Sequence, residues 1–306
     1  MINQLNEIVE KSGVLKDLDL LEVSIFNFSS KNKKMETFSF SEKREEKKKR
    51  AYFDLASVTK ILTNGLINII EKNELGNELK LCLEHRSGIP SWGILSNTNW
   101  KKEVSSYVIK ESPTLYSDIG ALRAQLIFEE VTKKSLYIEA KKFWHNEVIH
   151  GRELSEEDSV LQTGYREKKI ILGQIHDPNA FNIKEKLSHA GLFATSLGLS
   201  STLIKIFTET NLKEKLINSK ASFPEKRFHL GWDTPSKENS LAGDELGQSC
   251  FGHLGFTGTS VWVDLEKEVG VCILSNITRD GWYNKERLNQ VRKEVGTLIL
   301  GNTNEP

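Results

Sequence analysis

The sequence predicts an α+β fold, with one antiparallel sheet built from both ends of the chain, helices flanking it, and a mainly helical domain inserted in the middle. Two observations carry this prediction. Alternating apolar and polar residues, typical of strands, occur within 21–40 and again within 227–275. Helical periodicity predominates between them. We therefore expect a sheet domain of residues 1–75 and 196–306, an inserted domain of residues 76–195, and a functional site in the cleft between the two.

Composition excludes several classes of function. The 306 residues include 42 Lys plus Arg and 42 Asp plus Glu, so the formal net charge is zero and no overall field attracts nucleic acid. Apolar residues make up 38% of the chain, which is ample for a buried core. Apolar runs such as Val271–Leu274 are far shorter than the ~20 residues that cross a bilayer. We expect neither a nucleic-acid partner nor a membrane span.

The first fifty residues predict a helix followed by a β-hairpin. Residues 5–16 have the amphipathic period of a helix. Leu21–Phe28 and Glu36–Phe40 alternate apolar and polar residues on either side of a polar tip, which predicts two paired strands. The charge run at 43–50 mixes basic and acidic side chains, so we interpret it as a solvated edge or loop.

A buried helix is predicted to begin at or near Ser57, where the apolar period changes to 3.6 residues. Its apolar stripe consists of Ile61, Leu62, Leu66, Ile69 and Ile70. In the inserted segment, residues 119–131 and 135–146 predict two further helices.

The last third of the chain predicts a helix, several strands and a closing helix. The helical patterns lie at Leu197–Thr208 and at about 284–300. Strands are predicted at Arg227–Asp233, Thr259–Asp264 and Val269–Ser275. These strands would join the N-terminal hairpin in one sheet.

The N-terminus and the cysteines favour a reducing compartment. Residues 1–23 mix acids and bases along an amphipathic period and lack the pattern of a secretion signal, so we expect a cytoplasmic protein. Cys82, Cys250 and Cys272 are too few and too scattered for a disulfide framework or a metal site. We interpret them as buried free thiols. The oligomeric state stays open.

Ser57 and Lys60 are the residues best placed for covalent chemistry. Three positions apart on a helix, their side chains share a face with Cβ atoms about 5–6 Å apart. A serine hydroxyl is a poor nucleophile unless a base takes its proton, and a lysine amine can do so. The pattern alone is weak, because Ser30 and Lys33 repeat it. Only Ser57 is followed by a buried helical pattern; a plain N-cap role is the alternative.

Further motifs accompany this pair in order along the chain. They are LCLEHRSGIP at 81–90, YSDIGALRAQ at 116–125, HDPNA at 176–180, HAGLF at 189–193 and GHLGFTGTS at 252–260. With Ser57 and Lys60 they resemble the Ser-x-x-Lys, His-x-Ser-Gly-Ile-Pro, Tyr-Ser-Asn and Lys-Thr-Gly elements of the serine β-lactamase and penicillin-binding-protein superfamily. The resemblance covers residues 50–280 and is strongest to the class C-like branch, which includes esterases and D-amino-acid peptidases. It implies a β-lactamase-like fold.

The resemblance also implies roles for individual residues. Ser57 would be the acyl-forming nucleophile, Lys60 its proton acceptor, and Tyr116 a second acid/base that relays the proton to the leaving group. The backbone N–H groups of Ser57 and Phe256 would form an oxyanion hole. We expect Tyr116 and Lys60 to titrate as a coupled pair. A structural tyrosine at a helix entry is the alternative for Tyr116.

Asp118 and Trp92 are candidate substrate-binding residues. Asp118 stands where many members of the superfamily have Asn. It would either cap the helix that begins at Ile119 or act directly beside Lys60, and capping is the favoured interpretation. Trp92 follows the Ser-Gly-Ile-Pro loop and would line an apolar substrate pocket or pack structurally.

The strand triad departs from the superfamily pattern. His253 offers only a partial positive charge at neutral pH where a lysine is usual, and Leu254 lacks the hydroxyl of threonine. Gly255 would permit close approach of a substrate. Thr257 is the candidate for the missing hydroxyl, although Thr259 has the same strand parity. Efficient recognition of a substrate carboxylate is therefore doubtful.

The resulting hypothesis is a serine hydrolase that forms an acyl-enzyme on a small ester or on an amide such as a D-amino-acid peptide. The altered triad motivates two others: a non-catalytic protein that binds a peptidoglycan-like ligand and, less favoured, a true β-lactamase. Metal-ligand spacings, nucleotide-binding loops and a Gly-x-Ser-x-Gly elbow are missing from the sequence, so we expect no metal and no cofactor. The direct roles of His176 and His189 stay open.

Overall fold

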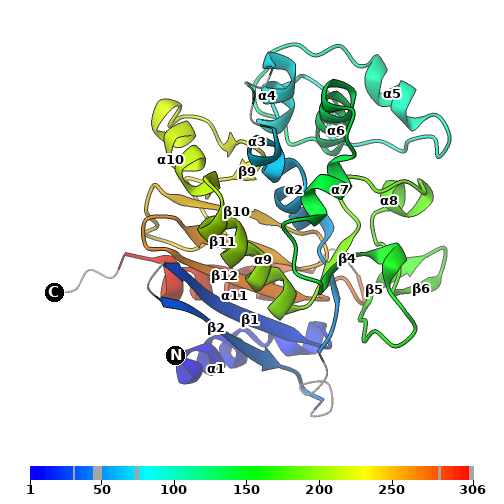
Figure 1. Ribbon diagram of the computed structural model, residues 1–306. Coiled ribbons are helices and arrows are strands. Elements are labelled where there is room, and N and C mark those ends of the chain that lie inside the picture. Colours follow the sequence, from blue (N-terminus) through cyan, green and yellow to red (C-terminus); the bar gives the residue numbers. More distant parts are fainter. Residues whose placement is uncertain (30–31, 44–49, 72, 74–75, 282–283, 303–306) are drawn as a thin grey trace.

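The computed structural model describes residues 1–29, 32–43, 50–71, 73, 76–281 and 284–302. Its central feature is a seven-stranded antiparallel sheet with the strand order β2-β1-β12-β11-β10-β9-β8 (Figure 1). The strands are β1 (Leu21–Ser29), β2 (Asn32–Phe40), β8 (Phe228–His229), β9 (Trp232–Asp233), β10 (Cys250–Leu254), β11 (Ser260–Asp264) and β12 (Val269–Ser275). Both ends of the chain contribute to this sheet, which confirms the predicted fold class.

Helices cover both faces of the sheet (Figure 1). They are α1 (Ile2–Ser12) and α11 (Glu286–Leu300) on one face, and α9 (Ser196–Glu209) with α10 (Leu212–Ser222) on the other. Alternation along β12 explains the two layers, because successive side chains of a strand point to opposite faces. Val271 and Ile273 belong to the core beneath α1 and α11, whereas Cys272 and Leu274 belong to the core beneath α9.

A second group of elements packs around a core of its own beside the sheet. Its helices are α4 (Asn77–Leu83), α5 (Trp100–Ser106), α6 (Asp118–Thr132), α7 (Leu136–Lys141) and α8 (Pro178–Asn182). It also contains a small sheet, β3-β7-β4, and a hairpin, β5-β6. These strands are β3 (Phe53–Asp54), β4 (Val148–His150), β5 (Gln162–Arg166), β6 (Lys169–Leu172) and β7 (Leu192–Ala194). Strands β4 to β7 were not predicted, because they are short and lie in a segment where helical patterns predominate.

The predicted helix at Ser57 is the main local difference. The segment consists of short helical turns, namely Ala56–Val58, α2 (Thr59–Leu62), Asn64–Leu66 and α3 (Ile67–Ile70). The break falls at Thr63, whose φ of −124° and ψ of −84° leave the helical region. Its hydroxyl donates to the carbonyls of Thr59 (2.9 Å) and Ser188 (2.7 Å), so a long-range hydrogen bond fixes the break.

Two other predicted elements differ at their ends. The strand expected at 227–233 is the hairpin β8-β9, because Leu230 and Gly231 have positive φ angles of 53° and 88° and make a tight turn. The first helix ends at Gly13, in the left-handed region, and a 3-10 turn follows it. Most of the charge run at 43–50 lies outside the described residues.

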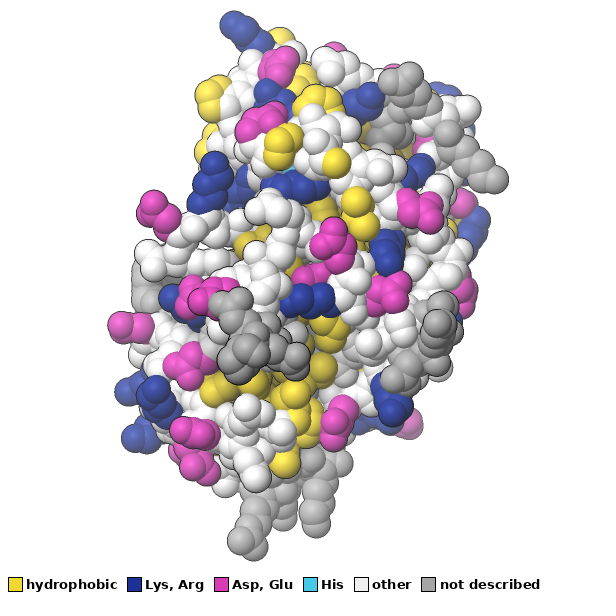
Figure 2. All heavy atoms as spheres, turned by 90° about the vertical axis from the view of Figure 1, so that its left-hand side faces the viewer, with side chains coloured by type: hydrophobic (Ala, Val, Ile, Leu, Met, Phe, Trp, Pro, Cys, Tyr) yellow, Lys and Arg dark blue, Asp and Glu magenta, His cyan; other side chains and the backbone are white. Residues whose placement is uncertain are grey.

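The surface agrees with the balanced charge. Figure 2 shows Lys and Arg interspersed with Asp and Glu over the face it presents. Among the helices described, none combines the length and apolar character of a bilayer span. Cys82, Cys250 and Cys272 are free and buried as predicted, and burial raises the pKa of each thiol to about 12.

Candidate active site

Ser57 lies on a tight turn that several distant residues hold in place. Strand β3 ends at Asp54, and Ala56 follows with a φ of 44°, a conformation uncommon for a residue with a side chain. The Asp54 carboxylate stabilises this turn: Oδ1 accepts the N–H of Ala56 (2.8 Å) and Oδ2 accepts the N–H of His176 (2.7 Å). Burial raises the pKa of Asp54 to about 6, against the effect of these two hydrogen bonds.

Lys60 contacts Ser57 directly. Its Nζ donates to Ser57 Oγ (3.0 Å) and to the carbonyl of His189 (2.9 Å), and it forms an ion pair with Asp118 Oδ1 at 2.7 Å. Only 2% of Lys60 is exposed. Burial by itself lowers the pKa of Lys60, but the Asp118 carboxylate and the Tyr116 phenol outweigh it and raise the pKa above its ordinary value. In this resting geometry Lys60 is an ammonium.

Asp118 acts on Lys60 and does not cap its helix. The N-cap of α6 is Ser117, whose Oγ accepts the N–H of Gly120 at 2.7 Å. The favoured expectation of capping by Asp118 is therefore wrong. Since Asp118 is the first residue of α6, its side chain is free to reach the Lys60 ammonium across the site.

Tyr116 is held by the loop at 81–90. The ring of His85 lies against the Tyr116 ring with centroids 4.7 Å apart, and His85 Nδ1 accepts the N–H of Ser117 at 3.0 Å. The Ser117 hydroxyl donates to the carbonyl of Pro90 (2.6 Å). The sequence identified the loop at 81–90 as a motif but assigned no role to it. In the structure the loop positions Tyr116.

The Tyr116 hydroxyl is buried near both Lys60 and Ser57. Burial raises the pKa of this phenol, and the charge of Lys60 opposes that rise. Lys60 Nζ lies 5.1 Å from the ring centroid. The hydroxyl has no well-aligned hydrogen-bond partner among the described residues, so it can still donate to a bound substrate.

His253 differs from the expectation of a partly charged side chain. It is 3% exposed, and its Nδ1 donates to the carbonyl of Leu254 at 2.8 Å. Burial and the nearby Lys60 ammonium lower the pKa of His253 to about 3, so the imidazole is neutral at physiological pH. The ring faces Tyr116 with centroids 5.7 Å apart.

Gly255 and Thr257 contact the nucleophile turn rather than open space. A Cβ on Gly255 would lie 2.6 Å from the carbonyl oxygen of Leu55 and would collide with the Thr259 hydroxyl. The Thr257 hydroxyl donates to the carbonyl of Asp54 (2.6 Å), and that of Thr259 to the carbonyl of Leu55 (3.0 Å). These hydroxyls and this glycine fix the turn that precedes Ser57, in contrast to the substrate-binding role expected for Gly255 and Thr257.

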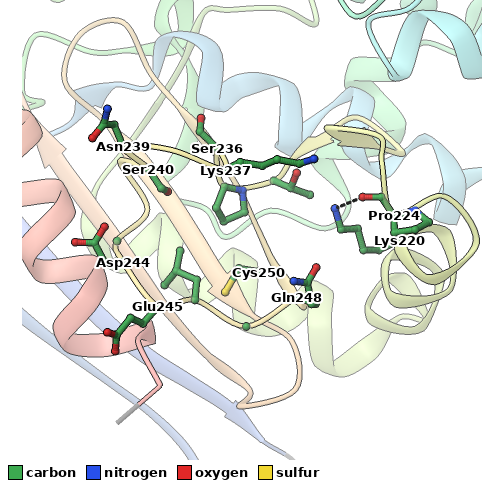
Figure 3. A pocket seen from close by; sticks show the side chains of 15 residues that line it. Lys220, Pro224, Ser236, Lys237, Asn239, Ser240, Asp244, Glu245, Gln248 and Cys250 are labelled. Carbon is green, nitrogen blue, oxygen red and sulfur yellow. Dashed lines mark hydrogen bonds between the residues drawn. The ribbon is translucent and has the colours of Figure 1, made fainter. Parts of the chain in front are cut away.

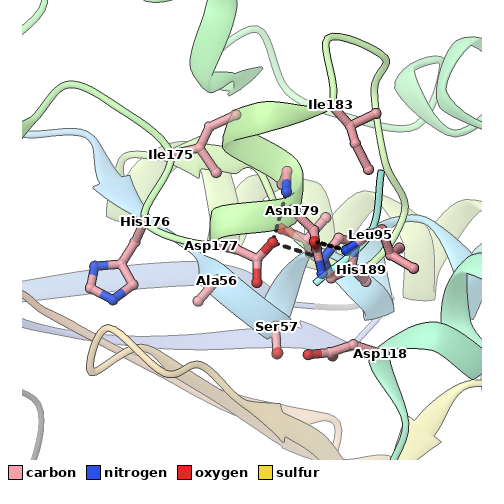
Figure 4. A network of polar contacts seen from close by, with 12 residues as sticks. Ala56, Ser57, Leu95, Asp118, Ile175, His176, Asp177, Asn179, Ile183 and His189 are labelled. Carbon is pink, nitrogen blue, oxygen red and sulfur yellow. Dashed lines mark hydrogen bonds and ion pairs between the residues drawn. The ribbon is translucent and has the colours of Figure 1, made fainter. Parts of the chain in front are cut away.

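A network of polar contacts borders the other side of the nucleophile (Figure 4). Asp177 Oδ1 accepts from the Ala180 N–H (2.8 Å) and pairs with His189 Nε2 (3.0 Å). Asn179 bonds the backbone of Gly93 and Leu95, which ties the loop after Trp92 to the same network. His189 thus acts through its carbonyl on Lys60 and through its ring on Asp177.

These groups surround a cavity of about 780 Å³. It is lined by Ala56, Ser57, Trp92, Tyr116, Asp118, Gly164, Tyr165, His176, Asp177, Pro178, His189, Ala190, Phe256, Thr278 and Gly281. The structure therefore brings Ser57, Tyr116, Asp118, Trp92 and Phe256 to one cavity, whereas Lys60, His253, Gly255 and Thr257 are not among its lining residues.

The sequence profile of the Beta-lactamase family matches residues 82–295, more than two thirds of the chain. The chain belongs to this family. The match includes Tyr116 and the 252–260 strand region, and Ser57 with Lys60 precede it.

Comparisons with individual proteins agree with this membership. This member of the Beta-lactamase family is 23% identical to an N-acetylmuramyl-L-alanine amidase of Bacillus subtilis (strain 168), over 86% of this chain and 76% of that relative. The octameric penicillin-binding protein homologue from Pyrococcus abyssi has a TM-score of 0.64 at 16% identity, covering 94% of this chain and 76% of the other. The structure of SurE with D-Leu also has a TM-score of 0.64, at 13% identity, covering 99% and 76%. At such identities the structures show a common fold.

A second cavity, of about 520 Å³, lies between the loop at 234–248 and the end of α10 (Figure 3). Of its two lysines, Lys220 and Lys237, the first donates to the carbonyl of Pro224 (3.1 Å). None of the sequence-predicted site residues lines this cavity, so the candidate site of this family member is the cavity at Ser57.

Two residues of the site escaped the sequence analysis. Asp54 lies three positions before Ser57, and its carboxylate accepts an N–H group of the tight turn. An aspartate in this position is a local sequence signal for such a turn and could have identified the residue. Asp177 lies inside the quoted HDPNA stretch, but its contact with His189 spans twelve residues and has no periodicity to reveal it.

Proposed function

We propose that this protein is a metal-independent serine hydrolase that forms an acyl-enzyme on Ser57. The observation that carries the proposal is the 3.0 Å hydrogen bond between Lys60 Nζ and Ser57 Oγ at the floor of a substrate-sized cavity. A lysine at this distance from a serine hydroxyl has the geometry of a nucleophile and its base. Membership of the Beta-lactamase family supports the same chemistry.

The reaction requires that Lys60 first give up a proton. Transfer of one proton from its ammonium to the Asp118 carboxylate leaves a neutral amine beside a neutral acid, with no change in total charge. The amine then takes the Ser57 proton as Oγ bonds to the substrate carbonyl carbon. The N–H groups of Ser57 and Phe256 receive the oxyanion, Tyr116 delivers its proton to the leaving group as that bond breaks, and the Lys60 ammonium returns a proton to Tyr116. Lys60 then takes a proton from water, whose oxygen attacks the acyl carbonyl, and this proton passes to Ser57 Oγ as the ester bond breaks.

An amide or ester of an amino acid is the proposed substrate class. The curated relative is named an amidase that acts at an amino acid, and a structural neighbour was solved with D-Leu. A penicillin fits less well, since the neutral His253 offers no cation to a substrate carboxylate. A β-lactamase activity is accordingly disfavoured.

Non-catalytic ligand binding is the second candidate, and one observation favours it. The ion pair with Asp118 holds Lys60 in its protonated form, in which it cannot act as a base. The two candidates differ in whether a covalent adduct forms on Ser57.

Intact mass spectrometry after incubation with a fluorophosphonate tests the proposal. We expect one adduct on the native protein and none on Ser57→Ala, with labelling of Lys60→Ala slowed strongly. A parallel incubation with a penicillin should give no stable adduct and little hydrolysis. A folded native protein that the fluorophosphonate leaves unlabelled would favour the non-catalytic candidate.

A further inference from the structure

One carboxylate oxygen in the lining of the cavity at Ser57 accepts no hydrogen bond from the described residues. Asp177 Oδ1 is fixed by the Ala180 N–H and by His189 Nε2, which sets the orientation of the carboxylate. Asp177 Oδ2 makes no hydrogen bond or ion pair with any residue that the structure describes. In Figure 4 this second oxygen points away from His189, on the side where Ser57 lies. The side chain is 16% exposed and lines the same cavity as Ser57.

The charges around the cavity suit a positive ligand. Among the described residues, its lining includes two carboxylates, Asp118 and Asp177, and no lysine or arginine. The charge of Asp118 is balanced by its ion pair with Lys60, whereas Asp177 has no lysine or arginine as an ion-pair partner among the described residues. The guanidinium of Arg166 is committed to the carbonyls of Ile175 (2.7 Å) and His176 (2.9 Å). His189 and neighbouring groups hold the pKa of Asp177 at about 2 against its burial, so it is ionised at neutral pH.

Other buried polar atoms of the lining have no well-aligned hydrogen-bond partner among the described residues. They are the hydroxyl of Tyr116, Nδ1 of His176, Nδ1 of His189 and Oγ1 of Thr278. Such atoms leave room for hydrogen bonds to the polar groups of a ligand in this cavity. The ligand must bring donors to Asp177 and both donors and acceptors to the others.

We propose that Asp177 is a specificity-determining residue that binds the free ammonium group of an aminoacyl substrate through Oδ2. The inference rests on the proposed function, because it places this ammonium next to the carbonyl that Ser57 attacks. An ionised carboxylate in a partly desolvated wall forms a strong charge-assisted hydrogen bond with an ammonium. A substrate with a blocked amine keeps its carbonyl and loses this contact.

The variant Asp177→Asn isolates the proposed contact. An asparagine can keep its carbonyl oxygen at the Oδ1 position, where Ala180 and His189 bind, and it places an amide N–H₂ where Oδ2 was. We compare leucine p-nitroanilide with N-acetyl-leucine p-nitroanilide, in both configurations at the α-carbon. The native enzyme should have a kcat/KM at least tenfold higher for the free amine, and Asp177→Asn should reduce this ratio at least tenfold.

A merely structural role predicts a different result, since it would slow both substrates by the same factor and leave the ratio unchanged. That result, or a native enzyme that prefers the acetylated substrate, would overturn the proposal. Asp244→Asn is the matched control, because Asp244 is a carboxylate paired with Lys293 outside this cavity. It should leave the ratio as it is in the native enzyme.

Binding measured without turnover separates this inference from the proposed function. In the Ser57→Ala background, calorimetry should show leucinamide binding at least tenfold tighter than N-acetyl-leucinamide, and adding Asp177→Asn should remove the difference. If this preference is found while the native protein fails to react with a fluorophosphonate, the ammonium site stands and the hydrolase proposal falls. Equal binding of both amides, in a protein that the fluorophosphonate labels, would refute the ammonium site alone.

Discussion

The two walls of the cavity at Ser57 use similar residue types for different purposes. On the wall that carries Ser57, charged and hydroxyl groups contact one another across the site, as in the contact of Lys60 with Ser57 and Asp118. On the wall formed by the end of β10 and the turn to β11, the hydroxyl of Thr257 and the imidazole of His253 bind backbone carbonyls instead. The side chains of the first wall contact one another in an arrangement suited to proton transfer. The side chains of the second wall bind the backbone and hold the site in place.

This difference explains why the altered strand triad is compatible with an intact nucleophile. Replacing the usual Lys-Thr pair removes a site for a substrate carboxylate, but Gly255, Thr257 and Thr259 still fix the turn before Ser57. The proposed ammonium site at Asp177 would place recognition elsewhere in the lining of the same cavity. Variants on the two walls should therefore differ in whether they alter turnover or stability.

The largest expected effect on turnover comes from Lys60→Met. Removing the amine eliminates general base catalysis, so kcat should fall by about 1,000-fold, within the usual range for such a group. The exchange also leaves the Asp118 carboxylate without its cation, which should lower the melting temperature. Steady-state kinetics and thermal unfolding measure the two effects.

The double variant Lys60→Met/Asp118→Asn separates these effects. It should recover the melting temperature, because the unpaired carboxylate is gone, and it should not recover kcat. Full activity of Lys60→Met would contradict the role of this wall in chemistry.

On the second wall, Gly255→Ala should act on the fold. Its Cβ would lie 2.6 Å from the Leu55 carbonyl oxygen, which cannot move without displacing the turn before Ser57. Overpacking of this kind costs about 3 kcal/mol. Gly76→Ala is the control, because a Cβ there meets nothing within 4 Å and φ is −59°. Denaturant unfolding should show a loss for Gly255→Ala far larger than for the control.

The sequence predicted the sheet well because its strands are long or regularly alternating. β1 and β12 pair over seven residues with consistent alternation, so their burial pattern is visible in the sequence. The helical turns around Ser57 were predicted as one helix because the apolar stripe runs through Thr63, and the hydrogen bond to Ser188 that breaks it spans 125 residues. Local periodicity contains no information about such a contact.

The candidate site divides in the same way. Ser57, Lys60 and Tyr116 belong to recognisable motifs, and the structure places them together. The partner of Asp118 and the hydroxyl contact of Thr257 depend on which groups face each other after folding, so the sequence favoured helix capping for Asp118 and left the choice between Thr257 and Thr259 open. The boundaries of the two domains stay a prediction.

Asp118→Asn should move the pH dependence of the reaction. Asp118 is the main cause of the raised pKa of Lys60, and without it burial lowers that pKa. Because Asp118 is the proposed acceptor of the Lys60 proton, the variant must release that proton to solvent before Lys60 can act as the base, and the acidic limb of the kcat/KM profile should shift to higher pH, toward the pKa of Lys60. An unchanged profile would show that Lys60 deprotonation does not limit the reaction. Asp244→Asn again controls for the loss of one negative charge elsewhere.

The smallest expected effect is that of Thr257→Val, and it sharpens the assignment of the second wall. The exchange removes the hydroxyl that donates to the Asp54 carbonyl at 2.6 Å and leaves that buried oxygen without this donor. Such a loss costs about 1–3 kcal/mol. The melting temperature should fall while KM stays within about twofold, because the hydroxyl faces the nucleophile turn and not the cavity. Thr257→Ser keeps the hydroxyl donor, so its melting temperature should be closer to that of the native protein. A KM that rises in Thr257→Val without a loss of stability would indicate that Thr257 binds substrate.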